Sequence, residues 1–176
     1  MRLILIFLLF LSTNLFSQSL TTSIDMQDEA GNAISLKQYT GKKILIAIVG
    51  NDLWKDKSPL LQFDSLQKAN PSIVVIVLPA SDFGNASDST IVSQDLQSSK
   101  SGLIKSSPAK VKKSNGKDRP QIIQWLSDVQ MNSHFDMDVL TDYQLYFINE
   151  TGALYAVLGK GASSATINEL LQQKNF

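Results

Sequence analysis

Lys43–Val49 (KILIAIV) and Ser72–Leu78 (SIVVIVL) are the two stretches of the sequence that decide the fold. After its first residue each is an unbroken apolar run rich in β-branched residues, and such runs are typical of strands that are covered on both faces of a sheet. Pro59, which suits the first turn of a helix, lies between them and precedes apolar residues at helical spacing: Leu60, Phe63 and Leu66. The order strand, helix, strand predicts a βαβ unit with two parallel strands.

Two further helices are expected in the middle of the chain. Asp88–Gln97 has apolar residues at helical spacing. Pro120 opens the second stretch, whose apolar side is formed by Ile122, Ile123 and Leu126.

The last third of the chain predicts a β-hairpin followed by a helix. Tyr143–Ile148 (YQLYFI) and Ala153–Leu158 (ALYAVL) are strand-like runs, and the tight-turn sequence Asn149–Gly152 separates them. In the final helix Thr166 and Glu169 have the spacing of a capping box, and three residues are expected to face inward: Ile167, Leu170 and Leu171. The whole pattern predicts an α/β fold, a mixed sheet with helices on both faces and a C-terminal hairpin plus helix.

The first seventeen residues have the pattern of a signal peptide. Arg2 precedes the apolar run Leu3–Leu11, which is shorter than the roughly 20 residues that span a bilayer. Ser17 offers a small residue at the cleavage position. We therefore expect residues 1–17 to be removed, residues 18–176 to form one domain, and the protein to be exported to the periplasm or the extracellular space without stable membrane insertion.

Charge and motifs exclude several classes of function. Sixteen basic and sixteen acidic residues balance in the full chain, so nucleic acid is not an expected partner. No glycine-rich phosphate-binding motif is present, and we expect no cofactor. The single histidine, His134, favours an exposed loop residue over a catalytic or zinc-binding one. Lys100–Arg119 holds seven basic residues and one acidic residue, which favours a solvated loop over an anion-docking surface.

Four segments resemble the glutathione peroxidase family. The opening shared with peroxiredoxins and related thioredoxin-fold proteins is similar to Ser35-Leu36, Tyr39 and Gly41-Lys42, and the family's glutamine loop is similar to Leu78-Pro79 with Phe83-Gly84. The family's approach to its penultimate helix resembles Pro108–Gly116, then Pro120 and Gln124–Leu126, and its Trp-Asn-Phe motif aligns with Thr141–Ile148 (TDYQLYFI). The resemblance covers roughly residues 20–172 and implies a thioredoxin-like fold.

The departures from the family affect its catalytic tetrad of Cys, Gln, Trp and Asn. The resemblance places Leu53 near the cysteine, Asp82 at the glutamine, Thr141 at the tryptophan and Asp142 at the asparagine. Asp52 and Trp54 are alternative residues for the cysteine position. The chain contains no cysteine at all, so no register restores the thiolate nucleophile. The resemblance therefore implies a degenerate member without thiol peroxidase activity.

Two interpretations of the function remain from the sequence. In the first, the protein is a non-catalytic module that binds an unknown protein or small ligand. In the second, it is an enzyme with residual or altered activity at the old peroxidase site, where carboxylates or a metal replace the thiol. Asp82 and Asp142, with Asp52 or Asp56 from the loop after Lys43–Val49, are the candidate ligands, and oxygen ligands of this type suit Ca²⁺ or Mg²⁺. The alternative to a metal site is that these aspartates point separately into water.

Overall fold

The structure, a computed structural model, describes residues 24–28, 30–50, 58–84 and 102–173. Its centre is a five-stranded mixed sheet with the strand order β5-β4-β3-β6-β7. The bounds of the strands are β3 Lys43–Val49, β4 Ile73–Pro79, β5 Ile104–Lys105, β6 Gln144–Ile148 and β7 Leu154–Leu158. A separate two-stranded sheet pairs β1 (Asp25–Gln27) antiparallel with β2 (Ala33–Ser35).

The predicted βαβ unit is confirmed. β3 and β4 are parallel, with Lys43 opposite Ile73 and Val49 opposite Pro79. The helix α2 (Ser58–Ala69) connects them, and its apolar stripe of Leu60, Phe63 and Leu66 is buried. On its other side β3 pairs antiparallel with β6, from Ile44 opposite Ile148 to Ile48 opposite Gln144. β3 therefore has a strand on each side, so both of its backbone edges are paired.

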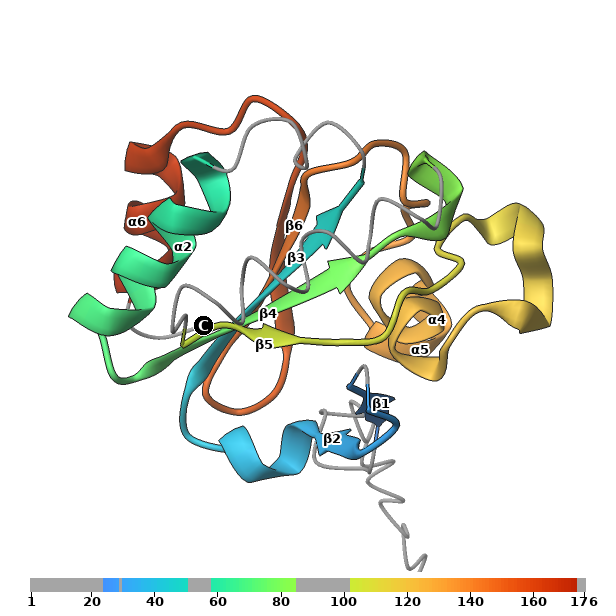
Figure 1. Cartoon of the computed structure of the whole chain (residues 1–176), viewed down its shortest axis with the longest axis horizontal. Helices are drawn as coiled ribbons and strands as arrows, with labels where there is room; N and C mark the ends of the chain where they lie inside the picture. The colour runs from blue at the N-terminus through green and yellow to red at the C-terminus, as the bar shows by residue number, and fades with distance from the viewer. Residues whose placement is uncertain (1–23, 29, 51–57, 85–101, 174–176) are drawn as a thin grey trace, which may run out of the picture.

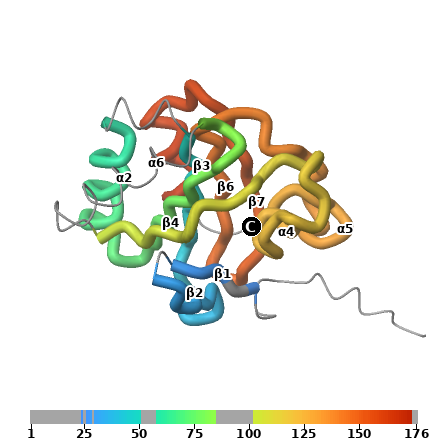
Figure 2. The backbone as a smooth tube through the Cα atoms, turned by 45° about the vertical axis from the view of Figure 1, so that its right-hand side comes forward, coloured from blue at the N-terminus to red at the C-terminus, as the bar shows by residue number. Residues whose placement is uncertain are grey.

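Alternate residues of the central strands face two separate cores. Ile44, Ile46 and Ile48 belong to the core that is shared with α4 (Gln121–Ser127). Leu45, Ala47 and Val49 belong to the core under α2 and α6 (Ser164–Gln172). Figures 1 and 2 show α2 and α6 on one side of the sheet, with α4 and the short α5 (Val129–Asn132) on the other. The predicted arrangement of helices on both faces is confirmed, and it follows from the two-residue period of a strand.

The predicted hairpin is also confirmed. β6 and β7 are antiparallel, and Gly152 in the turn has a φ of 84°, a conformation that glycine adopts without a steric cost. The Asn149 side chain stabilises this turn because its Oδ1 accepts hydrogen bonds from the backbone of Thr151 and Ala153.

The predicted start of the last helix is wrong by three residues. The N-cap of α6 is Ser163, whose Oγ accepts a hydrogen bond from the Thr166 backbone N–H at 3.1 Å. Thr166 therefore lies inside the helix and does not form a capping box with Glu169. Of the three residues expected to face inward, Ile167 and Leu171 are buried and Leu170 is half-buried.

The basic segment is more ordered than the sequence predicted. Residues 102–119 contain β5 and the 3-10 helix η3 (Lys113–Asp118), and Val111 is fully buried in the core. Two of the lysines form ion pairs, Lys110 with Asp118 and Lys113 with Asp136. The predicted helix Asp88–Gln97 lies outside the described residues.

Candidate functional site

Three segments meet at the carboxyl end of β3. Gly50 follows the strand and is buried. A Cβ atom added to Gly50 would lie 2.6 Å from the Cβ of Phe83 and 2.7 Å from the Cβ of Asp142. The short helix η2 (Ser81–Phe83) and the segment before β6 therefore pack directly on the Gly50 backbone. This junction is where the resemblance to the peroxidases puts Asp82 and Asp142.

Asp82 holds the segment 111–115 in place. Its carboxylate accepts hydrogen bonds from the backbone N–H groups of Val111 and Lys112 and from the Asn115 side-chain amide. Partial burial raises the pKa of this carboxyl, but the three sets of hydrogen bonds and the charge of Lys112 together lower the pKa below its ordinary value. Asp82 is therefore an ionised residue whose oxygens are already used by the protein.

The segment held by Asp82 also contacts its neighbours through its lysines. The Lys112 ammonium lies over the Phe83 ring, 4.8 Å from its centroid. The Lys113 backbone N–H donates to Asp138 at 2.7 Å, and the Lys113 ammonium pairs with Asp136. These contacts connect η2, the start of η3 and the segment before β6 into one unit.

Asp142 has a different partner. Its side chain is only 12% exposed, and its Oδ1 lies 3.3 Å from the Lys160 ammonium, which comes from the turn after β7. Thr141 beside it is exposed. Tyr143 follows with a φ of 62°, donates its backbone N–H to Ile48 and stacks on Phe63 with the ring centroids 5.8 Å apart. Burial raises the pKa of the Tyr143 phenol.

The structure brings Asp82 and Asp142 to the same junction but gives each carboxylate its own protein partners. Within the described ranges, no group of three or more His, Asp or Glu side chains is placed to hold a metal ion. The shared-cation site stays a prediction, because the other residues proposed for it, Asp52 and Asp56, lie outside the described residues. Leu53 and Trp54 lie outside them as well. The prediction for His134 is confirmed: the residue is exposed, and its Nδ1 lies 2.8 Å from the Asn132 carbonyl oxygen.

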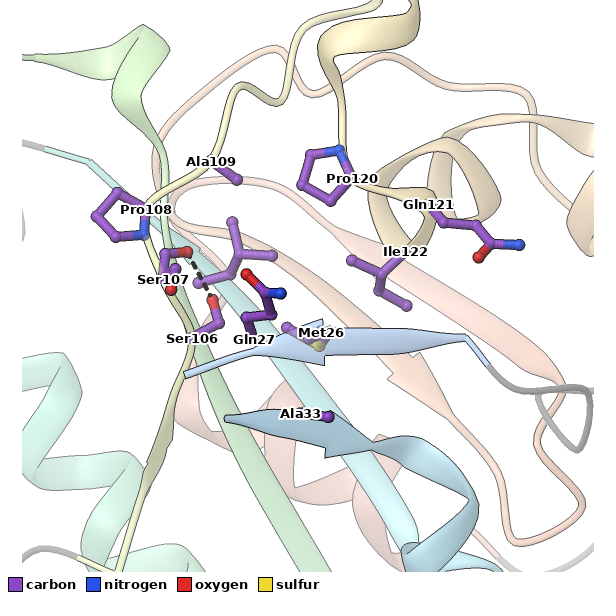
Figure 3. A pocket seen from close by; sticks show the side chains of 11 residues that line it. Met26, Gln27, Ala33, Ser106, Ser107, Pro108, Ala109, Pro120, Gln121 and Ile122 are labelled. Carbon is purple, nitrogen blue, oxygen red and sulfur yellow. Dashed lines mark hydrogen bonds between the residues drawn. The ribbon is translucent and has the colours of Figure 1, made fainter. Parts of the chain in front are cut away.

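A cavity of about 490 Å³ lies elsewhere, between the β1–β2 hairpin and the start of α4. Its walls come from β1, β2, the end of β4, residues 106–109 and residues 120–122, as Figure 3 shows. Asp82, Thr141 and Asp142 are not among its described lining residues, and Leu53 lies outside the described part of the chain. The sequence pattern gives no sign of this cavity, because β1, β2 and β5 are too short to leave a periodic signal.

No protein-family model matches the sequence, and no curated protein matches it either. Solved structures do match. Trgpx in its apo form is 18% identical, with 87% of this chain and 93% of that chain covered and a TM-score of 0.64. T. cruzi GPX1 is 15% identical, with coverage of 85% and 94% and a TM-score of 0.61. The chain has the thioredoxin fold.

A third similar structure is that of a thiol:disulfide interchange protein and not of a peroxidase. It is a thioredoxin-family thiol:disulfide interchange protein from Chlorobium tepidum TLS, 14% identical, with 85% of this chain and 91% of that chain covered and a TM-score of 0.61. At sequence identities of 14–18% the similarity shows the fold alone, which peroxidases and disulfide-exchange proteins share. In the described part of the chain, no helix is long and apolar enough to cross a bilayer.

Proposed function

We propose that this protein is an exported, glutathione peroxidase-like member of the thioredoxin fold that has no thiol redox activity and acts by binding. The observation that carries the proposal is the absence of cysteine from all 176 residues. Peroxide reduction and disulfide exchange on this fold both need a thiolate, so the reaction that the fold usually supports has no nucleophile here.

The junction at Gly50 supports the same proposal. Asp82 uses both carboxylate oxygens to hold residues 111–115, and Asp142 is paired with Lys160. Phe83 and Asp142 leave no room for even one additional carbon on Gly50. A reacting group would need unoccupied polar atoms facing open space, and these residues instead hold the segments of the protein together.

Export is supported by the sequence of residues 1–17, with a basic residue, a short apolar run and a small residue at the cleavage position. Mass spectrometry of the secreted or periplasmic protein tests it. The expected mass begins at Gln18, and a mature form that retains Arg2 and fractionates with membranes would contradict it.

Activity assays test the non-catalytic part of the proposal. With hydrogen peroxide or a lipid hydroperoxide, and glutathione or thioredoxin as reductant, turnover should equal the rate without protein. Insulin reduction tests disulfide exchange in the same way. Sustained turnover that Asp142→Asn abolishes would refute the proposal and favour carboxylate chemistry at the old site. Asp136→Asn is the matched control, because Asp136 is an exposed aspartate that also pairs with a lysine.

A further inference from the structure

The cavity between the β1–β2 hairpin and α4 is uncharged. The described residues that line it include apolar side chains such as Met26, Leu78 and Ile122, two prolines, two serines and two glutamines, but no acidic or basic residue. We call it the hairpin pocket. Its volume of about 490 Å³ lies within the range of pockets that hold small molecules. A charged ligand would lose part of its hydration there without gaining an ion pair.

The walls of the hairpin pocket are fixed by the backbone. Ser107 donates its N–H to the Gln27 carbonyl at 2.7 Å, and its hydroxyl donates to the Asp28 carbonyl. Ala109 donates to the Pro79 carbonyl at 2.9 Å, which joins the same wall to the end of β4. Gln27 itself pairs with Ala33 across the hairpin. The pocket is therefore formed before a ligand arrives, and little ordering opposes binding.

One side-chain amide points into this space. Figure 3 shows Gln27 extending from β1 between Ser106 and Ile122, whereas the Gln121 amide points away. Among the interactions of the described residues, the Gln27 amide has no hydrogen-bond partner. Ser106 beside it is only 2% exposed, and its hydroxyl donates to the Ser107 carbonyl at 3.1 Å. An amide that both donates and accepts is thus available to a ligand, in a pocket whose lining also includes Met26, Leu78 and Ile122.

We propose that the hairpin pocket binds a small uncharged molecule with a compact apolar body and one amide-like group that pairs with Gln27. The inference deepens the binding role proposed above and rests on it. The two proposals are nevertheless tested separately. If the protein shows neither redox turnover nor binding at the hairpin pocket, the proposed ligand site is wrong and the proposal of a non-catalytic protein stands.

Benzamide, benzoate and benzamidinium test the proposal, because the three probes have nearly the same shape and differ in charge. Each is titrated into the purified ¹⁵N-labelled protein, and amide chemical shifts are recorded. Benzamide should give saturable shifts confined to residues 26–27, 33, 106–109 and 121–122, and the two charged probes should bind about tenfold more weakly. No saturable shift with benzamide up to its solubility limit, shifts centred on Gly50 and Asp142, or equal affinity for the charged probes would each overturn the proposal.

Two variants connect the binding to named residues. Ala33→Trp fills the hairpin pocket and should reduce benzamide affinity by about tenfold or more. Ala165→Trp places the same side chain on the exposed surface of α6 and should leave affinity unchanged. Gln27→Leu should weaken benzamide but not its hydrocarbon isostere α-methylstyrene, because only benzamide uses the amide. Circular dichroism melting verifies that each variant is folded, and equal loss of both probes in Gln27→Leu would contradict the role of Gln27.

Discussion

Gly50→Ala should destabilise the protein strongly, although it adds a single methyl group. The new Cβ would lie 2.6 Å from the Phe83 Cβ and 2.7 Å from the Asp142 Cβ. Neither neighbour is the end of a flexible side chain, so relief requires the backbone of η2 or of the segment before β6 to move. Gly50 does not have a positive φ, and the predicted cost therefore comes from the clash and not from backbone strain.

The magnitude follows from these two contacts. Overpacking a well-packed site typically costs about 1–3 kcal/mol, and two rigid clashes put the loss of unfolding free energy near the upper end, about 3 kcal/mol. At about 2–4 °C for each kcal/mol in a chain of this size, the melting temperature should fall by about 6–12 °C.

Gly159→Ala is the matched control for this prediction. Gly159 is exposed, has no positive φ, and a Cβ there would have no atom within 4 Å. Thermal unfolding by circular dichroism, with urea unfolding as a second measurement, compares the two variants. If Gly50→Ala melts at the same temperature as Gly159→Ala, the close packing of three segments on the Gly50 backbone is wrong.

Three further predictions concern charged and ionisable groups. Asp82→Asn should lower the unfolding free energy by about 1–3 kcal/mol, because the variant loses a charged acceptor of several hydrogen bonds, while exposed Asp136→Asn should have an effect below about 1 kcal/mol. Since the pKa of Asp82 is lowered in the folded protein, its stabilisation is present above about pH 3.8, the ordinary value, and the difference between wild type and Asp82→Asn should shrink as pH falls through the lowered pKa. Lys43→Met should increase hydrogen exchange in the last turn of α6, because the buried Lys43 ammonium donates to the carbonyl of the C-cap residue; exposed Lys42→Met should not. Burial raises the pKa of Tyr155 to about 12 and also raises the pKa of the other three tyrosines, so urea unfolding should show stability falling as pH rises above about 10, where the unfolded chain ionises first. Unchanged stability between pH 9 and 11 would contradict this prediction.

The helices and strands that could be predicted from the sequence are those whose buried positions recur as apolar residues at regular spacing. The two faces of β3 are both covered, so its seven residues are all buried and the six after Lys43 form one apolar run. α2 and α4 have one buried side and show it at helical spacing. Short elements give no such pattern. β1 and β2 have three residues each and pair with each other, whereas β5 has two residues and is positioned by β4, whose paired residues lie 28 positions earlier in the sequence.

The resemblance indicated the segments that meet at Gly50, but it did not indicate which contacts their side chains make. The resemblance places Asp82 at a catalytic position, whereas its actual partners are backbone N–H groups of residues 111 and 112, which only tertiary structure brings near. The start of α6 illustrates the same limit locally. Ser163 and Thr166 are both acceptable N-caps, and the neighbouring Glu169 favoured the wrong one in the sequence analysis.

The position of β3 in the sheet also has a consequence for how the chain reaches its native state. One neighbour, β4, follows soon after it, but the other, β6, pairs Ile148 with Ile44 and is synthesised only near the end of the chain. Pairs so distant in sequence form slowly, because a long loop must close before they contribute any stability. Until then the backbone of KILIAIV has one unpaired edge and its apolar surface is incompletely covered, which exposes this segment to aggregation on the nascent chain.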